Sequence, residues 1–151
     1  MKKNILMVAL LAVGAFAQTK PEFSLTLRSK KDTWKVGSRI EVEVRKTNIS
    51  DHALMIGGGI NPGGVYSYDV RRDGNPVAET EAVKSEREKQ MKEPHRYEQG
   101  SLINATLPPH RTETNIIPVS AYRDMSQPGT YTIQLQQDVV KSNTVTVTVE
   151  P

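Results

Sequence analysis

The sequence contains no cysteine, only three histidines and few aromatic residues. Without cysteine, the chain has no disulfide framework, thiol nucleophile, thiolate metal site, covalent haem attachment or acylated lipoprotein anchor. The histidines, His52, His95 and His110, fall in three separate predicted turns or loops, and the chain has no HExxH motif. A zinc site would need these side chains to converge in space. The sequence therefore predicts neither a metal site nor a cofactor.

Long hydrophobic runs are missing too, except at the amino terminus. Lys2 and Lys3 precede an uncharged, mostly apolar run over residues 5–16, and small residues flank Phe16 at Ala15 and Ala17. This order is typical of a secretory signal peptide cleaved after Ala17. The run is shorter than the roughly 20 residues of a bilayer span. We expect residues 1–17 to be removed, leaving a periplasmic or secreted protein without a stable membrane span.

The mature chain carries no excess of one charge. The formal net charge of +3 falls to +1 when Lys2 and Lys3 are removed, and the remaining charges of both signs are interleaved. Nucleic-acid binders usually concentrate basic residues on one face, so we expect no nucleic-acid partner. Residues 18–151 have the length of one domain that folds around a single core.

Apolar and polar residues alternate with period two in several segments, which is typical of strands with one buried face. The clearest sets are Phe23, Leu25 and Leu27; Ile40, Val42 and Val44; Tyr131, Ile133 and Leu135; and Val145, Val147 and Val149. Weaker candidates are residues 53–56, 66–72 (before the hairpin pair Asp73-Gly74), 76–79, 101–107 and 112–119. Seven to nine short strands with turns between them predict an all-β fold, an immunoglobulin-like antiparallel β-sandwich.

Two stretches interrupt the strand pattern. Residues Gly57–Gly64 form a glycine-rich loop, and the insertion Thr80–Gly100 is rich in charged residues. Residues 80–93 lack proline and predict either one short surface helix, capped by Thr80 and closed by Pro94, or a mobile insertion that joins strands of opposite sheets. Apolar residues are too few there for a strong inward-facing stripe.

Two motifs resemble known sequences. Residues 33–52 read TWKVGSRIEVEVRKTNISDH, similar to the opening of many bacterial immunoglobulin-like domains, where a "VG" turn precedes a strand that ends in "TNxSD". Residues 122–134 read YRDMSQPGTYTIQ, similar to the "YDLSQPGxYTIQ" stretch of small secreted bacterial proteins of unknown role. Similar patterns occur in the non-catalytic β domain of secreted metallopeptidases and in the intracellular proteinase inhibitor family. The resemblance implies a sandwich in which Tyr131 packs its ring at a corner while its hydroxyl bonds to the backbone.

Catalytic motifs are absent from the sequence. It has no G-x-S-x-G elbow, and the glycine-rich loop lacks the GK[ST] of a phosphate-binding loop. Glu41 and Glu43 lie on the wet face of a strand instead of converging in a cleft. We therefore interpret the protein as non-enzymatic.

Binding through long segments at the ends of the sandwich is the remaining interpretation. The candidate contact residues, all of low specificity as a pattern, are Gly58, Asn61, Tyr66, Tyr68 and Tyr97. The expected partner is an envelope protein or a protease. Alternatives are a proteinase inhibitor that presents a protruding loop and a carbohydrate-binding accessory domain with an aromatic platform. The sequence leaves the oligomeric state open.

Overall fold

A computed structural model describes residues 20–57, 65–93 and 104–151. Its strands are β1 (Phe23–Ser29), β2 (Thr33–Lys35), β3 (Glu41–Asn48), β4 (Leu54–Gly57), β5 (Ser67–Arg72), β6 (Asn75–Pro76), β7 (Asn104–Leu107), β8 (Thr112–Pro118), β9 (Gly129–Gln137), β10 (Val140–Lys141) and β11 (Val145–Glu150). The helices are α1 (Glu81–Lys92) and the 3-10 turn η1 (Val119–Ala121). In these residues no helix is long and apolar enough to cross a membrane.

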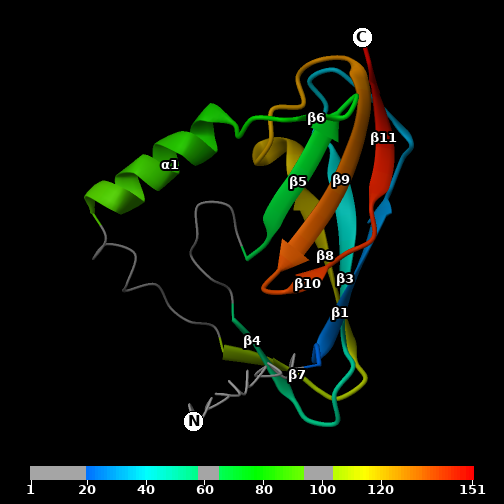
Figure 1. The fold of residues 1–151 in the computed structure, drawn as a ribbon, viewed down its shortest axis with the longest axis vertical. Helices are drawn as coiled ribbons and strands as arrows, with labels where there is room; N and C mark the ends of the chain where they lie inside the picture. Colours follow the sequence, from blue (N-terminus) through cyan, green and yellow to red (C-terminus); the bar gives the residue numbers. More distant parts are fainter. Residues whose placement is uncertain (1–19, 58–64, 94–103) are drawn as a thin grey trace, which may run out of the picture.

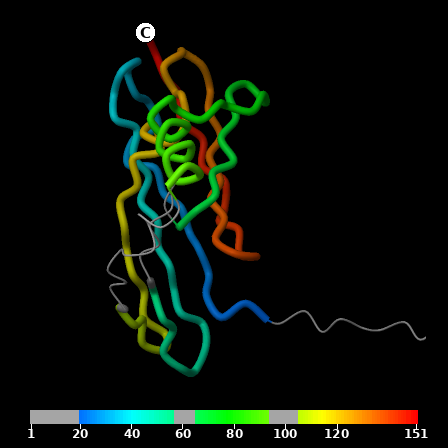
Figure 2. The backbone as a smooth tube through the Cα atoms, turned by 90° about the vertical axis from the view of Figure 1, so that its left-hand side faces the viewer, coloured from blue at the N-terminus to red at the C-terminus, as the bar shows by residue number. Residues whose placement is uncertain are grey.

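The strands form two facing layers (Figures 1 and 2). One sheet has the order β1-β3-β8, and the other has the order β2-β11-β9-β5-β6 with β10 paired to β9. The amino-terminal segment contributes to both layers, since β1 pairs with β3 whereas β2 pairs with β11. A short β4-β7 ladder follows β3 and precedes β8. This topology confirms the predicted all-β, immunoglobulin-like sandwich.

Two details differ from the sequence-based expectation. The β2-β11 pair is parallel, although the sandwich was expected to be antiparallel throughout. The described residues form eleven strands instead of seven to nine, because β2 and β10, with three and two residues, were not predicted. Such short strands are defined by their partners in the sheet, and periodicity cannot detect them.

The core lies between the two sheets and contains the apolar residues of the segments in which apolar and polar residues alternate. The apolar members of β1, β3, β9 and β11 pack together with Val70 and Met125. Tyr131, Ile133 and Leu135 are all 0% exposed. The Tyr131 hydroxyl donates to Gln127 O at 2.7 Å, so the predicted tyrosine corner is confirmed.

Three connections that contain glycine close the sandwich at the end that carries η1. Gly37 has φ +80° in the β2-β3 turn, a conformation that favours glycine. At Gly129 (φ +150°) an added Cβ would lie 2.9 Å from Arg72 Cγ. The predicted Asp73-Gly74 hairpin turn joins β5 to β6, and both residues have positive φ.

Candidate functional site

Two of the tyrosines predicted as contact residues, Tyr66 and Tyr68, pack in or against the core. Tyr68 lies on the inner face of β5, is 9% exposed and stacks on Tyr122 with 4.6 Å between ring centroids. Burial raises the pKa of the Tyr68 hydroxyl. Tyr66 is half-buried just before β5, and burial, together with the Glu113 carboxylate, raises its pKa. Tyr68 is therefore a packing residue and does not form part of an exposed contact surface.

The other predicted contact residues are not placed. Gly58 and Asn61 of the glycine-rich loop and Tyr97 of the insertion lie outside the described residues. The structure thus brings Tyr66 and Tyr68 to one face of the sandwich. Whether Gly58, Asn61 and Tyr97 lie near these two tyrosines stays untested.

Helix α1 is the surface helix that the insertion predicts. The Thr80 side chain accepts from Val83 N at 3.4 Å, as an N-cap does, and its hydroxyl donates to Ala121 O at 2.8 Å. Val83 alone is buried among the helix residues. The helix stands out beside the sandwich (Figure 1), and Met91 near its far end is 69% exposed.

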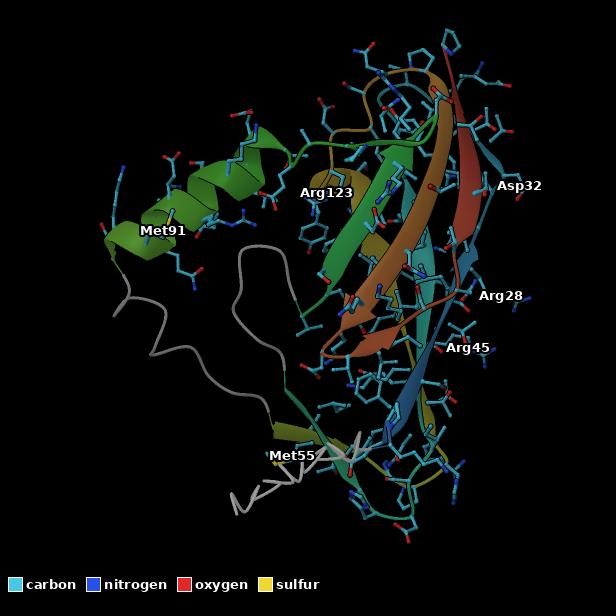
Figure 3. The ribbon with its side chains drawn as sticks, in the orientation of Figure 1. Arg28, Asp32, Arg45, Met55, Met91 and Arg123 are labelled. Carbon is cyan, nitrogen blue, oxygen red and sulfur yellow. The ribbon has the colours of Figure 1, made fainter. Side chains whose placement is uncertain are left out.

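A carboxylate shared by two arginines holds α1 to the sandwich. Glu79 accepts from Arg87 Nη1 and Nη2 at 2.7 and 2.6 Å, and Arg123 Nη1 lies 3.0 Å from Glu79 Oε1. The hydrogen bonds from Arg87 and Arg123 lower the pKa of Glu79. Arg123 also donates to Tyr68 O at 3.0 Å and lies between the helix and the sheet (Figure 3). Glu79 and Arg123 together therefore link α1, the segment before it and the edge of β5.

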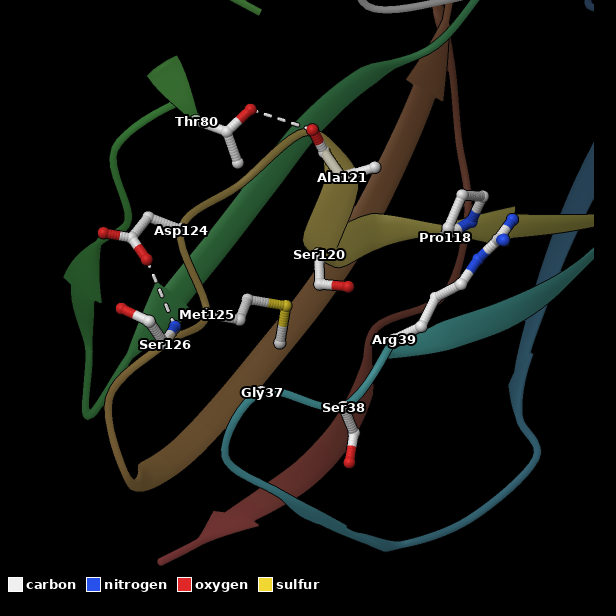
Figure 4. Close-up of a pocket in the computed structure, with 10 residues that line it drawn as sticks. All are labelled: Gly37, Ser38, Arg39, Thr80, Pro118, Ser120, Ala121, Asp124, Met125 and Ser126. Atoms are coloured by element: carbon white, nitrogen blue, oxygen red, sulfur yellow. Dashed lines mark hydrogen bonds between the residues drawn. The ribbon is translucent and has the colours of Figure 1, made fainter. Parts of the chain in front are cut away.

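A hollow of about 570 Å³ lies beside this anchor, at the end of the sandwich (Figure 4). Its walls are the β2-β3 turn (Gly37 to Arg39), Thr80, the η1 segment and residues 124–126. Met125, 4% exposed, contributes a side chain that also belongs to the core. The volume is within the usual range for ligand pockets, and the hollow is open to solvent.

Several polar groups that line the hollow have partners within the chain. Ser120 Oγ accepts from Ile40 N at 3.0 Å, and Asp124 Oδ1 accepts from Ser126 N at 3.2 Å. The hydrogen bonds from the Ser126 hydroxyl and N–H lower the pKa of Asp124. Among these lining residues the Asp124 carboxylate contacts the Ser126 hydroxyl, and no histidine lies beside the two to serve as the base of a nucleophilic serine.

Two buried polar residues of β3 were missed by the sequence analysis. Lys46 is 6% exposed, its Nζ lies 4.2 Å from the centre of the Phe23 ring, and burial lowers its pKa. Asn48 is fully buried and bonds to His52 O, Leu107 O and Ser50. The signal was present, because the alternation that places Val42 and Val44 inside continues through both residues.

The placed histidines do not converge. His52 pairs with Glu22 and Asp51, and His110 lies in the turn before β8. In residues 20–57, 65–93 and 104–151, no group of three or more potential metal ligands comes together.

Comparison with known proteins gives one weak structural similarity to report. No protein-family model and no curated protein sequence matches the chain. A solution NMR structure of the CARDB domain of PF1109 from Pyrococcus furiosus is 13% identical, with a TM-score of 0.40. The match covers 85% of this chain and 94% of that domain. The resemblance to secreted immunoglobulin-like proteins, metallopeptidase β domains and proteinase inhibitors stays a prediction.

Proposed function

We propose that this protein is an exported, non-enzymatic binding module that contacts a partner protein of the cell envelope through one end of its sandwich. The end consists of the open hollow and helix α1. The observation that carries the proposal is that α1 projects beside the hollow and is fixed there by Glu79, Arg87 and Arg123. A projecting helix next to a hollow presents a concave surface, the shape that binding sites usually have.

Export rests on the amino-terminal pattern of Lys2, Lys3 and the apolar run. We expect the protein isolated from its native envelope to begin at Gln18 and to be periplasmic or secreted. Intact-mass analysis tests this directly. A mature protein that retains residues 1–17 would contradict export by signal cleavage.

Carbohydrate binding is disfavoured by the aromatic rings. Carbohydrate binding would need an exposed aromatic platform, yet every phenylalanine, tyrosine and tryptophan in the described residues is buried or half-buried. Trp34, the only tryptophan, is half-buried and donates from Nε1 to Lys31 O at 3.1 Å. The proteinase-inhibitor alternative is tested by stoichiometric inhibition across a protease panel.

Site-resolved crosslinking tests the proposed surface. A photoreactive residue replaces Ala121, whose side chain is exposed at the hollow, and the matched control carries it at exposed Thr26 on the outer face of β1. In envelope preparations we expect one discrete crosslinked protein from position 121 and none from position 26. Adding Ala121→Trp protein, which fills the hollow, should not compete with the crosslink, whereas unmodified protein should. Equal crosslinking at both positions would contradict the proposal.

A further inference from the structure

The exposed edges of the two sheets are mostly blocked by side chains or by short neighbouring segments. At the outer edge of β1, Asn143 Oδ1 accepts from Leu27 N at 2.7 Å and Asn143 Nδ2 donates to Leu27 O at 3.1 Å. The amide of Asn143 thus occupies the place of a further strand. Blocking of this kind prevents edge-to-edge association.

The second sheet is blocked in the same way. On the outer edge of β5, Arg123 donates to Tyr68 O, and Val77 N donates to Val70 O at 2.9 Å. The strands at the two ends of this sheet, β2 and β6, have three and two residues, and β6 contains Pro76. Short strands and proline are common means of protecting an edge.

Strand β8 differs from these edges. It is seven residues long and pairs with β3 on one side, and no other strand in the described part of the chain pairs with it. Asn48 N donates to Arg111 O at 2.9 Å, so the hydrogen-bonding groups of Glu113, Asn115 and Ile117 also face β3. Those of Thr112, Thr114 and Ile116 therefore face outward. Ile116 is 42% exposed on this strand.

We propose that the β8 edge is a self-association site, at which β8 of a second copy adds antiparallel with the two-fold axis at Thr114. The two sheets then join into one continuous sheet. In this register Thr114 pairs with its copy, and Thr112 pairs with Ile116 of the second copy on either side. Each hydrogen-bonded pair exchanges two main-chain bonds, so the edge forms about six.

The charged and polar side chains of β8 select this register. With the axis at Thr114, Glu113 lies opposite Asn115 of the second copy, and the amide of Asn115 can donate to the carboxylate. Moving the axis to Glu113 would place two like charges directly opposite each other, which is destabilising. Moving it to Asn115 would place Thr112 opposite Pro118, which has no N–H to donate. One register therefore satisfies both charge and hydrogen bonding.

The contact is narrow, so the expected dimer is weak and concentration-dependent. Stable interfaces bury about 1,200 Å² of surface or more. A single added strand buries less surface than most stable interfaces do. Sedimentation velocity of the processed protein at increasing concentration should show the mean mass rising from one chain toward two. This inference does not depend on the proposed partner surface, which lies at the end of the sandwich.

Two substitutions at one position test the edge. Thr114→Pro removes an outward N–H without removing a bond to β3, and proline is tolerated on such edges. Thr114→Ala keeps the N–H and serves as the matched control. We expect Thr114→Pro to weaken association about ten-fold and Thr114→Ala to behave as the unmodified protein, both with unchanged circular dichroism. Undiminished association of a folded Thr114→Pro variant would overturn the proposal.

A single engineered thiol tests the register. Because the chain has no cysteine, Thr114→Cys introduces one thiol per copy, about 5.5 Å apart between Cα atoms across the axis, which a disulfide can span. Under mild oxidation we expect a covalent dimer to form about ten-fold faster than with Thr26→Cys. Equal rates would overturn the register. One further result would overturn the association site: the mass of a single chain at all concentrations, together with slow hydrogen exchange at Thr112, Thr114 and Ile116. That result would show that the chain itself covers the β8 edge.

Discussion

Strand β9 and helix α1 are stabilised in opposite ways. The inner face of β9 buries Tyr131, Ile133 and Leu135 completely between the two sheets. Helix α1 buries only Val83 and is held by its Thr80 cap and the ion pairs of Glu79. This small domain therefore combines a core of many apolar contacts with an end that depends on a few polar contacts.

The two kinds of stabilisation differ in cooperativity. Core contacts are shared among strands from both sheets, so they are lost together when the domain unfolds. A helix of twelve residues is marginal in water without tertiary contacts, and α1 has few. We therefore expect α1 to open locally while the sandwich stays folded.

The largest effect is expected in the core. Leu135→Ala should lower the free energy of unfolding by about 3 kcal/mol, because it removes buried methyl groups and leaves a cavity. Urea unfolding of dilute protein gives this value. Val139→Ala, at a turn residue that is 79% exposed, is the control and should change it by less than about 0.5 kcal/mol. Equal losses would contradict the placement of the core.

The next effect is expected at Asn48. Its Nδ2 donates to His52 O and Leu107 O at 2.8 and 2.9 Å, and its Oδ1 accepts from Ser50. Asn48→Ala should cost about 2 to 3 kcal/mol, since it leaves buried carbonyl groups unpaired. Asn75→Ala, at an exposed position that begins β6, is the matched control. A loss no larger than that of the control would refute the structural role of the TNxSD motif.

Tyr131→Phe should have a smaller effect, about 1 kcal/mol. The substitution keeps the buried ring and removes only the hydroxyl that donates to Gln127 O. Urea midpoints of the two proteins measure the difference. A loss comparable to that of Leu135→Ala would mean that the corner hydrogen bond matters far more than its geometry indicates.

The smallest global effect and the clearest local one are expected at Glu79. Glu79→Gln should reduce the helical signal at 222 nm and change the free energy of unfolding of the sandwich by less than about 1 kcal/mol. Glu88→Gln, exposed on α1, is the control. A large global loss would place α1 within the cooperative core.

The pH dependence of α1 has a defined sign. The pKa of Glu79 is lowered in the folded protein. The contribution of Glu79 to the stability of α1 is therefore complete above the ordinary carboxyl pKa, and it is lost as the pH falls through the lowered pKa. We expect the helical signal to decline below about pH 4. Helicity that instead falls as the pH rises from 5 to 8 would contradict the anchor.

The sequence predicts the regular parts of the molecule and misses the contacts that depend on distant residues. Alternation locates β1, β3, β9 and β11, and local capping chemistry locates α1 at Thr80. The role of Glu79 depends on Arg123, which is far away in the chain, and no local pattern indicates this pair. Tyr68 was interpreted as a contact residue because aromatics on loops often bind. The alternation of Tyr68 with Val70 indicated an inner face instead.

Native-state hydrogen exchange tests the contrast between β9 and α1 most directly. The amides of Ile133 and Leu135 should exchange only through global unfolding, with the same free energy as urea denaturation. The amides in the second half of α1 should exchange through openings several kcal/mol smaller, and Glu79→Gln should lower that value further without changing the value for β9. If the amides of α1 and β9 exchanged through openings of the same free energy, the contrast between the two elements would be wrong.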